Sequence, residues 1–97
     1  MAVIETVTFR LAPGVAETEF LDADGQAQTE FFYAQRGLVR RTTARGAGGE
    51  WLVLTLWGSS DDADASTEAG RHDAAASRWA TCLEPSSVAT NRYRALD

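Results

Sequence analysis

The sequence predicts one α+β domain whose elements follow the order strand, helix, strand, strand, helix, strand. Three observations lead to this class. Apolar residues alternate with a period of two in the strand-like segments, and they recur every three to four residues in two other segments. Turn residues separate the segments, and each boundary below rests on them.

The first strand is expected over residues 2–11, where Val7 and Phe9 lie on one face and Thr8 on the other. Pro13-Gly14 ends it. A helix is then expected from Val15 to Arg36, with Gly37 as its C-terminal cap. Its apolar stripe follows helical spacing: Ala16, Phe20, Ala23, Ala27, Phe31 and Ala34.

A hairpin follows, with strands over residues 38–45 and 51–57 joined by the glycine-rich loop 46–49. The later strand is apolar on both faces. Residues 51, 53, 55 and 57 lie on one face, and the leucines at 52, 54 and 56 lie on the other. Both faces should therefore be covered. The two helices can cover one face, and the sheet of a second copy of the chain is the economical cover for the other.

A second helix is expected to begin after Gly58-Ser59-Ser60 and to end before Pro85. Gly70 is a position at which it can divide into two pieces. Its expected inward stripe is Ala65, Ala69, His72, Ala76, Trp79 and Leu83. A last strand of weak pattern covers residues 87–95.

Right-handed crossovers turn this order into an antiparallel four-stranded sheet with both helices on one face, which is the ferredoxin-like βαββαβ fold. Ninety-seven residues make a single domain, 1–97. A chain this short has a thin core, so dimerisation is also favoured by size.

The composition and charge of the chain indicate which classes of binding partner are not expected. The net charge is −5, so a nucleic-acid partner is not expected. No membrane span or signal peptide is expected, which predicts a cytoplasmic protein. All nine basic residues are Arg, which suggests a GC-rich bacterial genome. Arg36, Arg40, Arg41 and Arg45 form either a solvated strand edge or a site for an anionic ligand.

Three segments together resemble the dimeric α+β barrel superfamily, and within it the antibiotic-biosynthesis-monooxygenase-like proteins. They are Phe9 to Val15 (F-x-L-x-P-G-V), Gln35 to Val39, and Trp51 to Ser59 followed by Asp62-Ala63. The resemblance implies two sheets packed face to face across a homodimer. The superfamily includes cofactor-independent monooxygenases that form quinones and oxygenases that degrade haem. The Asn, Trp and His of the haem-degrading members are absent, since the aligned positions hold Thr6 or Thr8, Ala65 and Ala75.

His72 is the only histidine and the candidate catalytic base, because histidine is the residue type suited to proton transfer at neutral pH and this one is expected to face the gap between the second helix and the sheet. The alternative is a half-buried or solvent-facing histidine. The candidate ligand-binding residues are Trp57, Trp51, Trp79, Tyr33 and Thr8. The alternative for the aromatic residues is that they form the hydrophobic core and the dimer interface.

Neither a metal site nor a cofactor is expected, because Cys82 stands alone and one histidine lacks a carboxylate cluster. Two functions stay open. One is a cofactor-independent monooxygenase acting on a phenolic polycyclic molecule, with His72 as base and Trp57 as a wall. The other is a non-catalytic dimeric module that binds a small aromatic ligand or has a structural role. Haem binding through His72 is a weaker third hypothesis.

Overall fold

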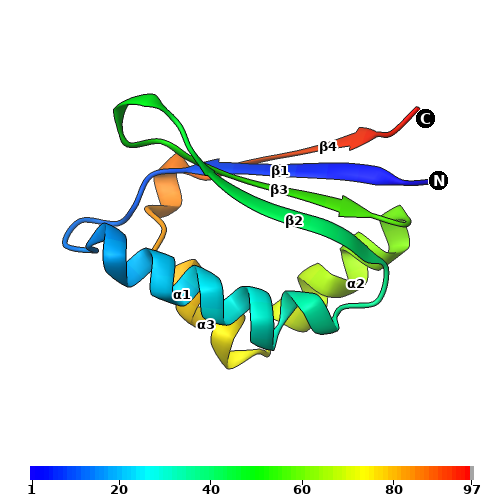
Figure 1. Ribbon diagram of the computed structural model, residues 1–97, viewed down its shortest axis with the longest axis horizontal. Helices are drawn as coiled ribbons and strands as arrows, with labels where there is room; N and C mark the ends of the chain where they lie inside the picture. Colours follow the sequence, from blue (N-terminus) through cyan, green and yellow to red (C-terminus); the bar gives the residue numbers. More distant parts are fainter. Residues whose placement is uncertain (97) are drawn as a thin grey trace.

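A computed structural model describes residues 1–96 and shows the expected order of elements (Figure 1). The strands are β1 (Val3–Phe9), β2 (Leu38–Arg45), β3 (Trp51–Trp57) and β4 (Ala89–Arg94). The helices are α1 (Glu17–Glu30), α2 (Ser60–Gly70) and α3 (Ala74–Thr81). The predicted α+β class is confirmed.

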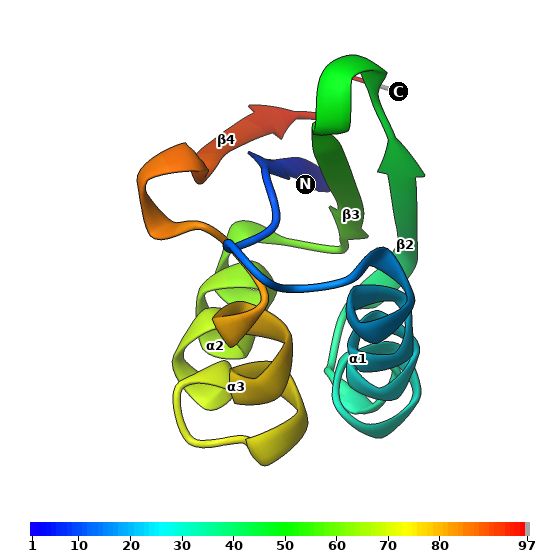
Figure 2. The same ribbon diagram turned by 90° about the vertical axis from the view of Figure 1, so that its left-hand side faces the viewer.

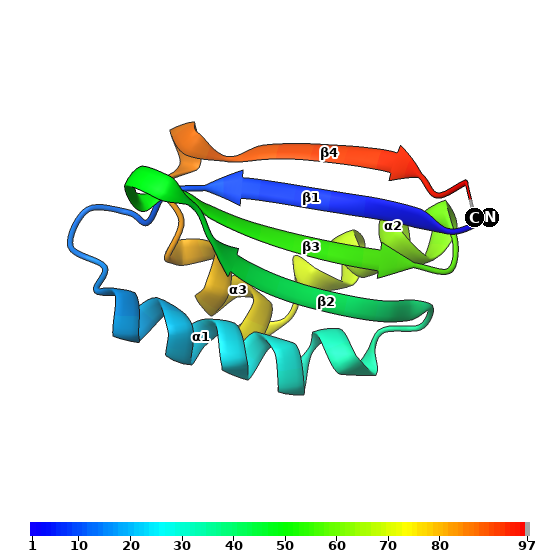
Figure 3. The ribbon, with the colours of Figure 1, turned by 45° about the horizontal axis from the view of Figure 1, so that its top comes forward.

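The four strands form one antiparallel sheet in the order β2-β3-β1-β4. All three helices lie on the same face of this sheet, with α1 beside the α2–α3 pair (Figure 2). Within residues 1–96, no helix lies on the other face (Figure 3). This arrangement is the one that right-handed crossovers require.

The core lies between the sheet and the helices, and its larger cluster is toward the end where β1 leaves the sheet. Phe9 packs edge-to-face on Phe20, with ring centroids 5.5 Å apart, and Phe20 contacts Trp51 at 4.9 Å. Phe20, Ala23, Ala27 and Phe31 are all buried, so the stripe predicted for the first helix is confirmed at these positions.

The first helix ends earlier than predicted. Its last residue is Glu30, and a short 3-10 helix at Phe32–Ala34 follows. Consecutive side chains of a helix point about 100° apart, so a continuous helix would separate Phe31 from Phe32. With the break, their rings pack edge-to-face at 4.9 Å. Gly37 is therefore not the cap of α1, although its φ of 82° does need glycine.

The second helix is divided in two, at the glycine named as a possible break. Asp73 caps α3 by accepting a hydrogen bond from the Ala76 backbone N–H at 2.9 Å. The break shifts the helical phase between α2 and α3. The predicted inward stripe, which assumed one continuous helix, therefore names the wrong face of α2. Ala65 and Ala69 are exposed, and the inward positions of α2 are Ala63 and Ser66.

The two faces of β3 differ as predicted. Trp51, Val53, Thr55 and Trp57 are buried under the helices, and the three leucines between them are only partly buried on the open face. Every residue of β4 is exposed in the single chain. No helix within residues 1–96 is long and apolar enough to cross a membrane.

Candidate functional site

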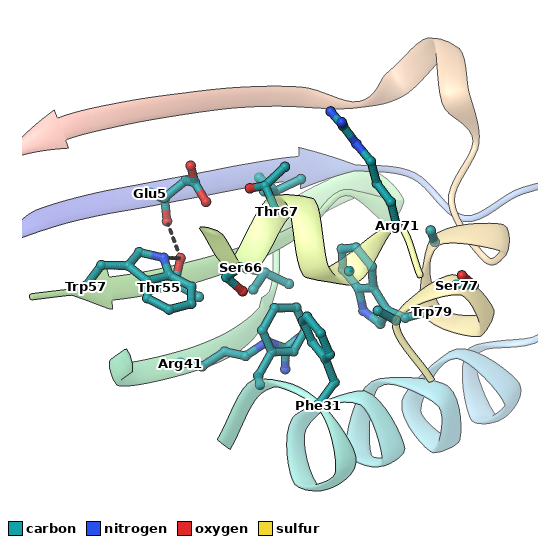
Figure 4. Close-up of a pocket in the computed structure, with 16 residues that line it drawn as sticks. Glu5, Phe31, Arg41, Thr55, Trp57, Ser66, Thr67, Arg71, Ser77 and Trp79 are labelled. Carbon is teal, nitrogen blue, oxygen red and sulfur yellow. Dashed lines mark hydrogen bonds between the residues drawn. The ribbon is translucent and has the colours of Figure 1, made fainter. Parts of the chain in front are cut away.

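A cavity of about 400 Å³ lies between the sheet and the α2–α3 pair (Figure 4). This is the place where a gap between the second helix and the sheet was expected from the sequence. Its floor comes from β1, β3 and β2, and its roof from the two helices and the end of α1. The lining residues are Glu5, Val7, Phe31, Phe32, Arg41, Val53, Thr55, Trp57, Ser66, Thr67, Gly70, Arg71, Ala76, Ser77, Trp79 and Ala80.

Four aromatic side chains form much of the apolar wall. Trp57 comes from the end of β3, Trp79 from α3, and Phe31 and Phe32 from the turn after α1. The indole N–H of Trp57 donates to the Thr55 hydroxyl at 3.1 Å, which fixes the ring inside the cavity. Flat rings on several sides suit a flat aromatic molecule.

A buried polar cluster supports the inner wall, and Asp24 of α1 is its centre. One carboxylate oxygen of Asp24 accepts from Arg41 at 2.7 Å and from the Trp79 indole N–H at 2.9 Å. The other accepts from the Thr43 hydroxyl at 2.7 Å. The cluster thereby ties α1, β2 and α3 together and orients two cavity residues, Arg41 and Trp79.

The side chain of Arg41 is fully buried, with 0% of its surface exposed. Besides Asp24, it donates to the Gln28 side-chain oxygen at 3.2 Å, and its guanidinium lies 4.4 Å from the centroid of the Phe32 ring. Among the described residues, its Nε has no hydrogen-bond partner. A buried donor without a partner is uncommon in folded proteins.

A second set of charges lies near the edge of the cavity at Glu5. Arg92 of β4 donates to the Glu5 carboxylate at 2.9 and 3.2 Å and to Asp64 of α2 at 2.8 Å. These two hydrogen-bonded carboxylates raise the pKa of Arg92 above its ordinary value. Within residues 1–96, Glu5 is the only acidic residue that lines the cavity.

The structure brings together only two of the five predicted ligand-binding residues, Trp57 and Trp79. Trp51 is buried in the core cluster around Phe20, away from the lining. Tyr33 is 61% exposed, and it does not line the cavity. Thr8 follows Val7, whose side chain lines the cavity, and so points to the opposite face of the sheet.

The orientation expected for His72 is wrong. Its side chain is 77% exposed in the turn after α2, 3.7 Å from the Glu68 carboxylate, and it is not among the cavity residues. The cause is the break between α2 and α3, because the predicted stripe assumed one uninterrupted helix. The alternative of a solvent-facing histidine describes the structure.

Sequence reasoning missed Asp24 and assigned Arg41 only to a cluster of four arginines. Asp24 left a signal in the sequence, because it lies four residues after Phe20 and three before Ala27, so an acid stands on an otherwise apolar helical stripe. Arg41 left no such signal, and only the structure pairs it with Thr55, whose side chain faces inward.

Residues 1–96 contain no group of three or more His, Cys, Asp or Glu side chains placed to hold a metal ion. Cys82 is buried in the core cluster and does not line the cavity. Burial, with the nearby Glu19 charge, raises the pKa of its thiol above the ordinary value.

Comparison with known proteins gives a result at the level of structure alone. No protein-family model and no curated protein sequence matches the chain. SnoaB, a cofactor-independent oxygenase from Streptomyces nogalater, is similar in structure with a TM-score of 0.80 and 17% identity, over 99% of this chain and 94% of that one.

Two further solved structures are similar. A candidate antibiotic biosynthesis monooxygenase from Caulobacter crescentus has a TM-score of 0.81 and 15% identity, over 99% of this chain and 91% of that one. A dimeric ferredoxin-like protein of unknown function from Thermobifida fusca has a TM-score of 0.74 and 15% identity, over 96% and 90%. The chain therefore has the ferredoxin-like fold of the antibiotic-biosynthesis-monooxygenase-like structures.

Proposed function

We propose that this chain binds a planar, electron-rich polycyclic phenol in its cavity and oxygenates it without a metal or a flavin. The observation that carries the proposal is the cavity itself, about 400 Å³ in volume and lined by Phe31, Phe32, Trp57 and Trp79. Small-molecule sites are usually apolar concavities of about 300–1,000 Å³ with a few polar groups. The structural similarity to SnoaB supports the reaction class.

The reaction balances for an anthrone-type substrate with dioxygen as the oxidant. A ring methylene group loses a proton, and the resulting carbanion transfers one electron to dioxygen. The two radicals combine into a peroxide, which takes up a proton and loses water to leave a quinone. One substrate and one dioxygen thus give one quinone and one water, and the protein supplies deprotonation, orientation and exclusion of bulk water.

We assign the role of proton acceptor to Glu5 in place of His72. Glu5 is the only carboxylate at the cavity wall in the part of the chain that the structure describes, and its side chain is 16% exposed. Arg92 holds this carboxylate in place through two hydrogen bonds to its Oε2. A positioned carboxylate can contribute about 10²–10⁴-fold to a proton transfer.

The first prediction tests this assignment by oxygen uptake with an anthrone-type substrate. Glu5→Gln keeps the size of the side chain and removes its basicity, so we expect the rate to fall by about a hundredfold. His72→Ala is the control, and we expect it to match the wild type because His72 is exposed outside the cavity. A wild-type rate equal to buffer would refute oxygenation of this substrate class. An unchanged rate in Glu5→Gln would refute only the role of Glu5 and not the oxygenation itself.

A second candidate function is non-catalytic binding of the same kind of aromatic molecule. It is favoured by the contacts of Glu5, because two hydrogen bonds from Arg92 already engage the carboxylate. Saturable quenching of tryptophan fluorescence by the ligand, together with oxygen uptake at the buffer rate, would select this function.

We further propose that the functional unit is a homodimer joined through the open face of the sheet. The support is the apolar character of that face, where the partly buried leucines of β3 have no helix over them. A second sheet would cover them.

A further inference from the structure

The hydroxyl of Ser66 is a hydrogen-bonding group that the fold leaves free on the inner side of α2. Ser66 lines the cavity and is only 4% exposed, and Figure 4 shows its side chain in the space between Trp57 and Phe31. Within residues 1–96 this hydroxyl makes no hydrogen bond. Its oxygen is nevertheless not closed off, because the Arg41 Nε is the one buried side-chain atom there that lacks both a partner and contact with open space. A molecule in the cavity can therefore reach the Ser66 hydroxyl.

The other hydroxyls of the cavity wall are engaged or lie in solvent. The Thr55 hydroxyl accepts from the Trp57 indole N–H at 3.1 Å. The Thr67 hydroxyl donates to a carbonyl of its own helix at 3.1 Å, and Ser77 is an exposed residue. In the part of the chain that the structure describes, Ser66 is therefore the buried hydroxyl of the wall that is free to bind a ligand.

The position of Ser66 on α2 favours close approach of a flat ring. Ala63 and Gly70 lie three residues before it and four after it, so they share its face of the helix and leave that face low. The helix backbone fixes the place of the hydroxyl before a ligand arrives, and the short side chain has little freedom to lose. Such preorganisation reduces the ordering cost of binding.

We infer that Ser66 donates a hydrogen bond to a carbonyl oxygen on the ring system of the ligand, so that the cavity selects aromatic ketones over aromatic hydrocarbons of the same shape. A ketone loses its hydrogen bonds to water when it enters an apolar cavity, and the serine hydroxyl, which can rotate toward an acceptor, replaces one of them. This inference rests on the proposed binding of an aromatic ligand and specifies which atom of the ligand is recognised and by which residue.

The test compares fluorenone with fluorene, two flat probes of nearly equal size that differ by one carbonyl group. Affinities are measured by quenching of tryptophan fluorescence in the wild type and in Ser66→Ala, which removes only the hydroxyl. We expect the ratio of fluorenone to fluorene affinity to fall by about three- to tenfold in the variant, the scale of one neutral hydrogen bond. Ser86→Ala is the control and should leave the ratio unchanged, because Ser86 lies in the turn before β4 and does not line the cavity.

Two further measurements do not depend on the affinity of the variant. The infrared carbonyl stretch of fluorenone bound to the wild type should lie at lower frequency than in an apolar solvent. The urea midpoint of Ser66→Ala without a ligand should equal or exceed that of the wild type, because alanine favours a helix and no hydrogen bond within the protein is lost.

The inference is overturned if Ser66→Ala leaves the affinity ratio unchanged or if bound fluorenone has an unshifted carbonyl stretch, since the carbonyl then does not meet this hydroxyl. A lower urea midpoint in Ser66→Ala also overturns it, because the hydroxyl would then have a partner within the protein. Binding of both probes with these results would leave the aromatic cavity standing without this recognition, whereas binding of neither would refute both. Fluorenone has no methylene hydrogen to lose, so oxygenation can fail for every substrate while this recognition holds.

Discussion

At the scale of single residues, the Asp24–Arg41 pair is the feature on which both the stability of the chain and the shape of its cavity depend. The side chains are 11% and 0% exposed, so both charges have left water. A buried pair of this kind adds little net stability over an apolar pair, but removing one partner leaves an uncompensated charge. The hydrogen bonds to Thr43 and Trp79 compensate part of the desolvation of Asp24.

The second prediction follows from this pair. Asp24→Asn keeps the shape of the side chain but leaves Arg41 without a counter-charge, so we expect the free energy of unfolding to fall by about 3–5 kcal/mol. The measurement is urea denaturation. The matched control is Asp22→Asn, which breaks an exposed pair with Arg78 and should cost less than about 1 kcal/mol. Equal effects of the two substitutions would contradict the assigned role of Asp24.

At the scale of elements, the turn between α1 and β2 sets the position of α2. Gly37 has a φ of 82°, and a Cβ added there would collide with the carboxylate of Asp62 in the first turn of α2. Its carbonyl also accepts a hydrogen bond from the Gly58 backbone N–H at 2.8 Å. The glycine therefore allows α2 to begin close against the sheet, and α2 supplies Ser66 and Gly70 to the cavity.

The third prediction compares two glycines. Gly37→Ala should destabilise the chain by more than about 1 kcal/mol, since both the positive φ and the contact with Asp62 oppose a side chain. Gly25→Ala, in the middle of α1 with nothing within 4 Å of the added Cβ, should stabilise it by about 0.5–1 kcal/mol. Thermal unfolding of both variants measures the difference. Destabilisation by Gly25→Ala, or none by Gly37→Ala, would show that this account of the two glycines is wrong.

At the scale of the whole molecule, the sheet is covered on one face only. The three helices cover the face that holds Trp51 and Trp57, and the leucines of β3 lie on the uncovered face (Figure 2). Residues of β1 on that face, including Ile4 and Thr8, are also only partly buried. A continuous, partly apolar sheet surface is typical of an interface between protein chains.

The fourth prediction concerns the mass of the particle in solution. Sedimentation at micromolar concentration should give about twice the chain mass of 10.5 kDa, and Leu54→Glu should lower it to the monomer value by placing a charge in the interface. Leu21→Glu is the control, because Leu21 is 43% exposed on α1, away from the sheet. A folded wild-type monomer, or a Leu54→Glu dimer as stable as the wild type, would exclude an interface at this face.

The sequence by itself determined the fold class, the boundaries of the β2–β3 hairpin and the two different faces of β3, because strand periodicity and turn residues act over a few positions. It also placed Phe20, Ala23 and Ala27 in the core. These features depend on local spacing alone.

Only the tertiary structure decided which residues meet at the cavity. The break at Gly70 changes the helical phase, which moves His72 into solvent and Ser66 inward. The Asp24–Arg41 pair joins residues 17 positions apart on different elements, so no local period indicates it. The physical reason is that a buried charge is acceptable only beside its partner, and the packing of α1 on β2 creates that partnership.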